Sequence, residues 1–222
     1  MALQLRDNLH WCDCGGRAVF LDVTEDRYFC LPGAANDAFL RLAGGKTQPG
    51  DAERLHSLIA RGLLIETSLR DPIRRPPRLT PPTRDFLDEA MAGARLIPIL
   101  RALGSELRAA WLLRRMPLQR VIVTALNDRP RWQRSRHHLD RSLETIVSAS
   151  IAASFLMRSH DRCLVRALAV QSACRKSGAK AKLVFGVIGH PFTAHCWVQL
   201  GNAVLVGGFE QARLYTPILV IE

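Results

Sequence analysis

A proline-rich segment in the first half of the chain sets the strongest limit on how these 222 residues can fold. Five prolines occur between Asp71 and Pro82. Proline breaks an α-helix and has no backbone N–H for a β-ladder, so no regular element can run through this segment. We therefore predict two domains, residues 1–70 and residues 84–222, joined by a linker over residues 71–83.

The first predicted domain alternates short apolar runs with turn residues, which is typical of strands and short helices. The expected order is three strands at Leu9–Cys12, Ala18–Val23 and Arg27–Leu31, a helix at Ala34–Leu42, a second helix capped by Asp51, and a closing strand at Leu63–Glu66. A β-hairpin followed by short helices and a closing strand predicts a winged-helix-like module.

The second predicted domain begins with helical periodicity and ends with apolar runs of strand length. The expected helices cover Arg84–Met116, Pro117–Asn127, His138–Arg158 and Cys163–Lys176, and the expected strands cover Ala181–Ile188, Ala194–Leu200, Ala203–Val206 and Ile218–Ile221. The predicted fold class is α+β, with helices packed on a small antiparallel sheet.

The formal net charge of +11 is concentrated in the middle of the chain. Residues 71–136 hold 14 arginines and 6 acidic residues. We identify no aromatic-interleaved basic motif in this range, so we interpret the charge as the solvated faces of helices and expect no nucleic-acid partner. A groove for an acidic peptide stays open. Residues 1–70 hold 8 basic and 9 acidic side chains, and the resulting net charge, 8 − 9 = −1, disfavours a DNA-binding winged helix.

The six cysteines include no C-x-x-C pair, so we predict no metal site. Met1–Asp7 lacks the basic and apolar regions of a signal peptide. The most apolar helix, Leu143–Met157, carries Glu144 and is too short to span a bilayer. The expectation is a reduced, cytoplasmic protein without a membrane span.

Two residues carry the chemistry of the second domain. Cys163 opens a predicted helix, and His195 lies 32 residues downstream in a strand-like run. Unpaired amides at a helix N-terminus and a nearby imidazole both favour a thiolate, which is the nucleophilic form of cysteine. The Cys163 amide could also donate to the oxyanion of a tetrahedral intermediate. This chain order resembles that of papain-like and transglutaminase-like thiol enzymes.

Other cysteines and histidines are weaker candidates for these roles. Cys174 lies in the middle of the same predicted helix and is expected to fill the core. Cys196 follows His195 in a strand, where alternation directs it to the opposite face. His190 precedes Pro191 in a predicted turn and ranks below His195 as the base.

A third residue should orient the imidazole by accepting a hydrogen bond from its second nitrogen. No Asp follows His195 on its strand. Glu210 is the nearest acidic residue, and Gln199 and Asn202 are amide alternatives.

Several runs of the sequence resemble one known family. Asp161–Ala169, Phe185–Val187 and Ala194–Gln199 resemble the transglutaminase-like cysteine peptidase domain of lasso peptide B proteins. Phe20–Asp22, Asp26–Pro32 and Arg61–Leu64 resemble the PqqD-like RiPP recognition element fused ahead of that domain in some members.

The resemblance implies a leader peptidase that uses no cofactor. Residues 1–70 would bind the leader of a ribosomally made lasso precursor peptide, and the thiol domain would cleave leader from core. A partner, an ATP-dependent lasso cyclase similar to asparagine synthetase, would then close the ring. Cys163 would be the nucleophile and His195 the base. The acid of the family normally stands near Gly207, which leaves Glu210 as the expected substitute.

We expect the leader to bind as an added strand at an exposed sheet edge. The predicted contacts are Arg27, Tyr28, Phe29, Cys30 and Leu31 on the edge strand, with Leu55, Leu58 and Ile59 lining the groove. The alternative is that these apolar side chains form the core of the module. Two further functions stay open: another thiol acyltransferase, transglutaminase-like or acting on an amine, and a non-catalytic chaperone for the precursor peptide.

Overall fold

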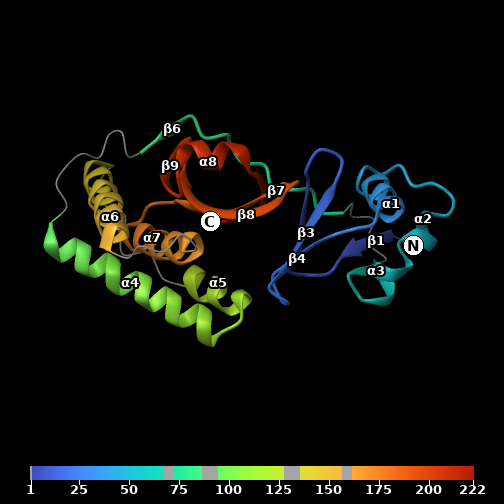
Figure 1. The fold of residues 1–222 in the computed structure, drawn as a ribbon, viewed down its shortest axis with the longest axis horizontal. Helices are drawn as coiled ribbons and strands as arrows, with labels where there is room; N and C mark the ends of the chain where they lie inside the picture. The colour runs from blue at the N-terminus through green and yellow to red at the C-terminus, as the bar shows by residue number, and fades with distance from the viewer. Residues whose placement is uncertain (1, 68–72, 87–94, 128–135, 157–161) are drawn as a thin grey trace. The chain divides into compact units, whose positions relative to one another are not determined.

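The computed structural model describes residues 2–67, 73–86, 95–127, 136–156 and 162–222 (Figure 1). They form a mixed α/β structure of two compact units. Unit 1 holds the chain up to Arg78 together with Val187–Thr193 and Thr216–Leu219. Unit 2 holds Leu79–Gly186, Ala194–Tyr215 and Val220–Glu222.

Unit 1 contains two antiparallel sheets and three short helices. The elements are β1 (Ala2–Leu5), β2 (Leu9–Asp13), β3 (Ala18–Asp22), β4 (Arg27–Cys30), α1 (Gly33–Ala43), α2 (Asp51–Arg54), α3 (His56–Ala60) and β5 (Leu64–Thr67). The strands β2, β3 and β4 form one sheet in that order, and β1 pairs with β5 in the other. The hairpin, the helices and the closing strand follow the predicted order, whereas β1 was not predicted.

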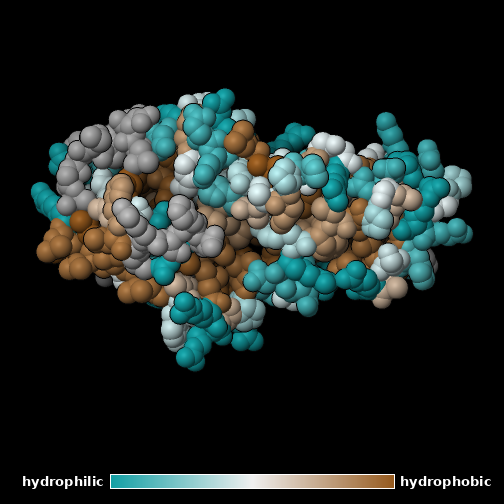
Figure 2. All heavy atoms as spheres, viewed as in Figure 1, coloured by the Kyte–Doolittle hydropathy of each residue, from teal (hydrophilic) through white to brown (hydrophobic). Residues whose placement is uncertain are grey.

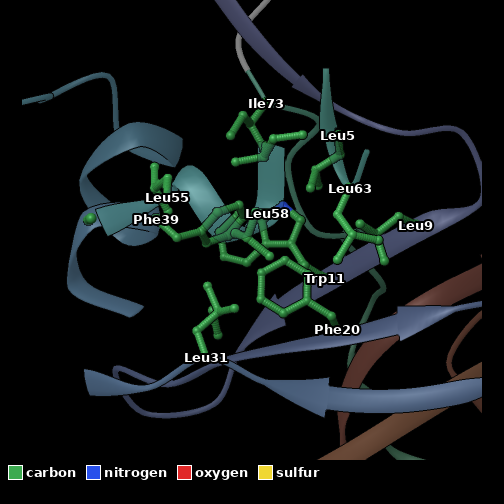
Figure 3. Close-up of a cluster of buried hydrophobic side chains, with 13 residues drawn as sticks. Leu5, Leu9, Trp11, Phe20, Leu31, Phe39, Leu55, Leu58, Leu63 and Ile73 are labelled. Carbon is green, nitrogen blue, oxygen red and sulfur yellow. The ribbon is translucent and has the colours of Figure 1, made fainter. Parts of the chain in front are cut away.

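An aromatic cluster forms the core of unit 1 (Figure 3). The Phe20 ring stacks on Phe29 with a centroid distance of 4.9 Å, and Phe39 meets Phe20 edge-on at 4.7 Å. Trp11 packs edge-on against Phe39 at 5.0 Å. Such contacts add to the stabilisation from apolar burial, so the β2–β3–β4 sheet is fixed to α1 through these rings.

Leu31, Leu55 and Leu58 belong to this core (Figure 3). The exposed fractions of Leu55 and Leu58 are only 1% and 3%. The structure therefore does not place these three side chains in an open groove, which corrects their expected role as peptide contacts. Ile59 is only partly buried against the cluster.

Asp51 does not cap α2 as predicted. Gly50 holds the cap position with a φ of 86°, and Asp51 is the first helical residue. Its buried carboxylate accepts hydrogen bonds from the Arg41 guanidinium and the Gln48 amide. These donors hold the pKa of the Asp51 carboxyl well below its usual value. The side chain thus joins α1 to the turn before α2.

The proline-rich segment is anchored to a unit at each end. Ile73 is buried in the core of unit 1, and the Trp11 indole N–H donates to the Arg74 carbonyl at 2.8 Å. Leu79 packs against a core cluster of unit 2, and the Thr80 carbonyl accepts from Gln199 at 2.7 Å. Within the described residues 73–83, contacts with its own unit therefore restrain each end.

The sheet of unit 2 has the strand order β10-β7-β8-β9-β6 (Figure 1). The strands are β6 (Arg84–Asp85), β7 (Lys182–Gly189), β8 (Phe192–Leu200), β9 (Ala203–Val206) and β10 (Thr216–Ile221), and α8 (Phe209–Leu214) lies between β9 and β10. β8 and β9 are antiparallel, with a register shift at Val198 and Gln199.

Arg84 does not begin a helix as predicted. It lies in β6, which pairs in parallel with β9 and adds an exception to the expected antiparallel sheet. The Thr83 amide donates to the Asn202 carbonyl at 2.9 Å, and the Asn202 amide donates to the Thr83 hydroxyl at 2.6 Å. These two hydrogen bonds hold Thr83 to the β8–β9 turn.

Four helices complete unit 2: α4 (Leu96–Arg115), α5 (Leu118–Asn127), α6 (Arg136–Leu156) and α7 (Cys163–Ser177). α4 packs against α6 and α7, while Leu96, Leu100, Leu107 and Trp111 on its other face are exposed. Figure 2 shows apolar side chains gathered over one end of α4. Phe155 on α6 is also exposed, to 75%. No helix in the described ranges has the length and apolar character needed to cross a bilayer.

Replacing Gly186 with Ala tests the packing of β7 against β8. A Cβ at Gly186 would lie 2.5 Å from Cζ3 of Trp197 and 2.9 Å from Cβ of Tyr215. We expect a loss of about 1–3 kcal/mol in the free energy of unfolding, because overpacking forces neighbours off their rotamers. Urea unfolding followed by circular dichroism measures this change.

Gly104→Ala is the matched control. A Cβ at Gly104 meets nothing within 4 Å, and the residue lies inside α4. Alanine should stabilise the helix by about 0.5–1 kcal/mol. Equal stability of the two variants would contradict the packing described for Gly186.

Candidate active site

The helix α7 presents Cys163 at its N-terminus. Arg162 is the cap residue, and Cys163 is the first residue of the helix. The Arg166 amide donates to the Arg162 carbonyl at 3.0 Å, which closes the first turn. The helix ends at Gly178, whose left-handed φ of 87° is typical of a glycine at a helix C-terminus. Cys163 therefore lies beside the unpaired amides of the first helical turn.

The strand β8 presents His195 to this helix end. The ring centroid of His195 lies 5.2 Å from that of Tyr215 and 6.2 Å from that of Trp197. Its Nε2 lies 2.6 Å from the carbonyl oxygen of Gly207. A carbonyl can only accept, so Nε2 carries the proton of this hydrogen bond, and the other ring nitrogen remains for a second partner.

Cys163 forms hydrogen bonds with both His195 and Cys196. The Cys196 side chain has the largest effect on the Cys163 pKa, followed by the His195 imidazole and the Cys196 backbone N–H. Together they outweigh burial and lower the pKa of the Cys163 thiol to about 4. Cys163 is therefore a thiolate at neutral pH.

His195 responds to the same contacts. Burial is the largest single influence and would lower the His195 pKa, but the hydrogen bonds to Cys163 and to the Gly207 carbonyl together raise it above its ordinary value. The pair is therefore a thiolate and an imidazolium, which supplies a nucleophile together with a proton for a leaving group.

Cys196 contacts Cys163, which its sequence position does not predict. Strand alternation was expected to direct the Cys196 side chain away from the site. The Cys196 thiol and backbone N–H nevertheless both form hydrogen bonds with the Cys163 sulfur. The hydrogen bond to Cys163 and then burial raise the pKa of Cys196 well above its ordinary value. Cys196 therefore remains a neutral thiol that donates to the Cys163 thiolate.

A cavity of about 310 Å³ opens onto Cys163 and His195. Its lining comes from Ile151 and Ser154 of α6, Arg162, Cys163 and Arg166 at the start of α7, and His195, Leu205, Val206, Gly207, Gly208 and Gln211. Arg166 also lies 3.8 Å from the buried carboxylate of Glu106 on α4. The cavity is thus lined by the Cys163 thiolate, the His195 imidazolium and two arginines, Arg162 and Arg166.

The structure does not bring Glu210 to His195. The Glu210 side chain on α8 is 84% exposed and lies 3.9 Å from the Arg213 guanidinium. The amide alternatives have other partners: Gln199 binds Trp197 and the carbonyls of Thr80 and Gly201, and Asn202 binds Thr83. The group that orients the imidazole is instead the Gly207 carbonyl.

Cys174 and His190, two of the weaker candidates, lie outside this cluster. Cys174 is fully buried in α7, where burial raises the pKa of its thiol to about 12. His190 lies in the turn between β7 and β8. In unit 1, Arg27 is exposed, and Tyr28, Phe29 and Cys30 of β4 are partly buried.

Comparison with known proteins identifies the family of the domain that contains Cys163 and His195. Residues 103–220, more than half of the chain, match the transglutaminase-like superfamily. The chain belongs to the transglutaminase-like superfamily. No curated protein and no solved structure matches it. The superfamily includes cysteine proteases and acyltransferases, and the matched range contains Cys163, His195 and Gly207.

Alkylation of Cys163 should depend on pH in a characteristic way. Because its pKa is lowered to about 4, the rate should fall as pH drops through that value and stay flat through neutrality. Replacing Cys196 with Ala removes a charge-assisted hydrogen bond worth about 1.5–3 kcal/mol, so the Cys163 pKa should rise by about 1–2. Iodoacetamide rates read by mass spectrometry, within the pH range where circular dichroism is constant, measure both values.

Cys174 is the internal control, since its buried thiol should stay unlabelled at these pH values. An unchanged profile in Cys196→Ala would contradict the donation from Cys196 to the Cys163 thiolate.

Glu210→Gln should leave the Cys163 alkylation rate and its pH profile unchanged, within about twofold. The exposed carboxylate pairs with Arg213 and does not contact His195. Surface ion pairs of this kind contribute little to stability. A clear loss of Cys163 reactivity in the same alkylation assay would show that Glu210 does act on the Cys163–His195 pair.

Proposed function

We propose that this protein is a leader peptidase of lasso peptide biosynthesis. Unit 2 cleaves a ribosomally made precursor between leader and core, and the N-terminal module, expected to be PqqD-like, binds the leader. The freed core then passes to an ATP-dependent lasso cyclase similar to asparagine synthetase. The observation that carries the proposal is the hydrogen-bonded Cys163–His195 pair at the cavity of a transglutaminase-like domain.

The geometry of the pair supports acyl transfer through Cys163. Its thiolate attacks the carbonyl of the last leader residue and forms a C–S bond, while the first-turn amides of α7 donate to the oxyanion. The His195 imidazolium gives its proton to the departing core amine as the C–N bond breaks. Water then attacks the thioester, His195 takes the proton, and the leader leaves as a carboxylate.

The arrangement of unit 1 supports binding of an extended peptide. Among the described strands, β4 ends the β2-β3-β4 sheet, and an edge strand can accept an added strand. Arg27 lies over the Phe29 ring at 5.8 Å and is exposed on that strand. Because Leu31, Leu55 and Leu58 are buried in the core, the proposed contacts are Arg27, Tyr28, Phe29 and Cys30, together with the partly buried Ile59. Tethering the precursor to the enzyme raises its effective concentration at Cys163.

One observation favours acyl transfer to an amine as a second candidate function. A carbonyl orients His195 but stabilises the imidazolium less than a carboxylate would. The imidazolium then gives up its proton readily, which helps the first step, while neutral His195 is a weaker base for activating water. A slow water step leaves more time for an amine to take the acyl group.

Cys163→Ala should bind a precursor but not cleave it. The substrate is a short precursor peptide encoded beside the gene, labelled with a fluorophore on its leader. We expect similar binding by fluorescence anisotropy, because the proposed leader contacts lie on β4, and at least about a 1,000-fold loss of cleavage because the nucleophile is gone. Mass spectrometry of the products, with and without an added primary amine, measures the reaction.

The matched control is Cys174→Ala, which changes a buried cysteine of the same helix and should retain cleavage. Cleavage by Cys163→Ala would overturn the peptidase proposal. A leader–amine adduct in place of free leader acid would favour the acyltransferase. Binding by the unaltered chain without any cleavage would favour a precursor chaperone.

A further inference from the structure

Cys196 is a second thiol at the nucleophile that the acyl-transfer chemistry does not use. It is 6% exposed, lies on β8, and forms a side-chain hydrogen bond with Cys163. His195 already supplies the proton for the leaving group, so the three side chains form a cluster in which one sulfur has no assigned role.

The two sulfurs differ in access and in charge. Cys163 lines the cavity of about 310 Å³ and is partly exposed, whereas Cys196 is buried beside it. A thiolate that reaches solvent is the form that oxidants attack. An oxidant that enters the cavity therefore meets Cys163 first and finds Cys196 within contact of the oxidised sulfur.

We propose that Cys163 and Cys196 form an oxidisable pair: a hydroperoxide converts Cys163 to a sulfenic acid, and Cys196 then closes a reversible disulfide. Cys163 would be the modified residue and Cys196 the resolving one. Formation of this disulfide requires the Cys163 nucleophile and its neighbour Cys196. It does not depend on whether the natural substrate is a lasso precursor.

The chemistry balances with hydrogen peroxide as the oxidant. The Cys163 thiolate attacks one peroxide oxygen, the O–O bond breaks, and the departing hydroxide takes the His195 proton to give water. The Cys196 sulfur then attacks the Cys163 sulfur, the S–OH bond breaks, and the Cys196 proton leaves with the hydroxide as a second water. Two thiols and one peroxide thus give one disulfide and two waters.

Cys12 and Cys14 provide a contrast elsewhere in the chain. Their sulfurs lie 3.7 Å apart, close to the contact distance of two thiols. Burial and the neighbouring Cys14 raise the pKa of Cys12 far above its ordinary value, so this thiol does not begin the oxidation as a thiolate. The two sulfurs are close together in both pairs. In the Cys163–Cys196 pair, one of them is also ionised and lines a cavity.

The test is to treat the full chain with a small excess of hydrogen peroxide at neutral pH, block remaining thiols, and digest with trypsin without reduction. Cleavage after Arg162, Arg166, Lys182 and Arg213 places Cys163 in the peptide 163–166 and Cys196 in the peptide 183–213. We expect these two peptides to be linked, with a loss of two hydrogens, and to separate after dithiothreitol.

Cys196→Ala should lose the link and trap Cys163 as a sulfenic acid that dimedone labels, or as the sulfinic acid that follows. Cys174→Ala is the matched control and should still form the linked peptides. In the unaltered chain, accumulation of sulfinic acid on Cys163, a link to another cysteine, or an unmodified Cys163 would each overturn the proposal. A chain that forms the link but does not cleave the precursor overturns the peptidase proposal alone.

Discussion

The chemistry of this protein depends on the contact between the first residue of α7 and the strand β8. That contact places the Cys163 sulfur against the His195 imidazole and against the thiol and backbone N–H of Cys196. Each partner donates to sulfur, so several hydrogen bonds stabilise the thiolate in a partly buried site. Without this packing, Cys163 would be an ordinary thiol at a helix end, where the helix dipole alone contributes only about 0.3–1 kcal/mol.

The packing of Trp197 explains why a main-chain group orients the imidazole. Gly207 has a φ of 110°, and a Cβ there would lie 2.5 Å from Cβ of Trp197. A side chain is therefore excluded at this point, and the strand brings its carbonyl to Nε2 of His195 instead. A sequence shows that no acidic residue stands at a position, but it does not show which backbone carbonyl contacts the His195 ring. Glu210, the acidic residue nearest to His195 in the sequence after it, is exposed to solvent instead.

The sequence was most informative where a local signal defines the structure. The start of α7 at Cys163 and the strand Ala203–Val206 agree with the predicted limits. β1 and β6 were missed because they exist only through pairing with distant strands. Alternation gave the faces of His195 and Cys196 but not the position of Cys163, whose sulfur receives a backbone N–H of β8 and so lies within reach of both residues.

The strength of thiolate stabilisation bears on what Cys196 does. Lowering a thiol pKa increases the thiolate fraction only until the pKa falls below the ambient pH, and beyond that point it reduces the nucleophilicity of each thiolate. The first-turn amides and His195 already favour ionisation of Cys163. A further donor that brings the pKa to about 4 adds little thiolate at neutral pH. Attack rate alone thus gives no reason for a thiol at this position, whereas a resolving sulfur must be a thiol that touches the nucleophile.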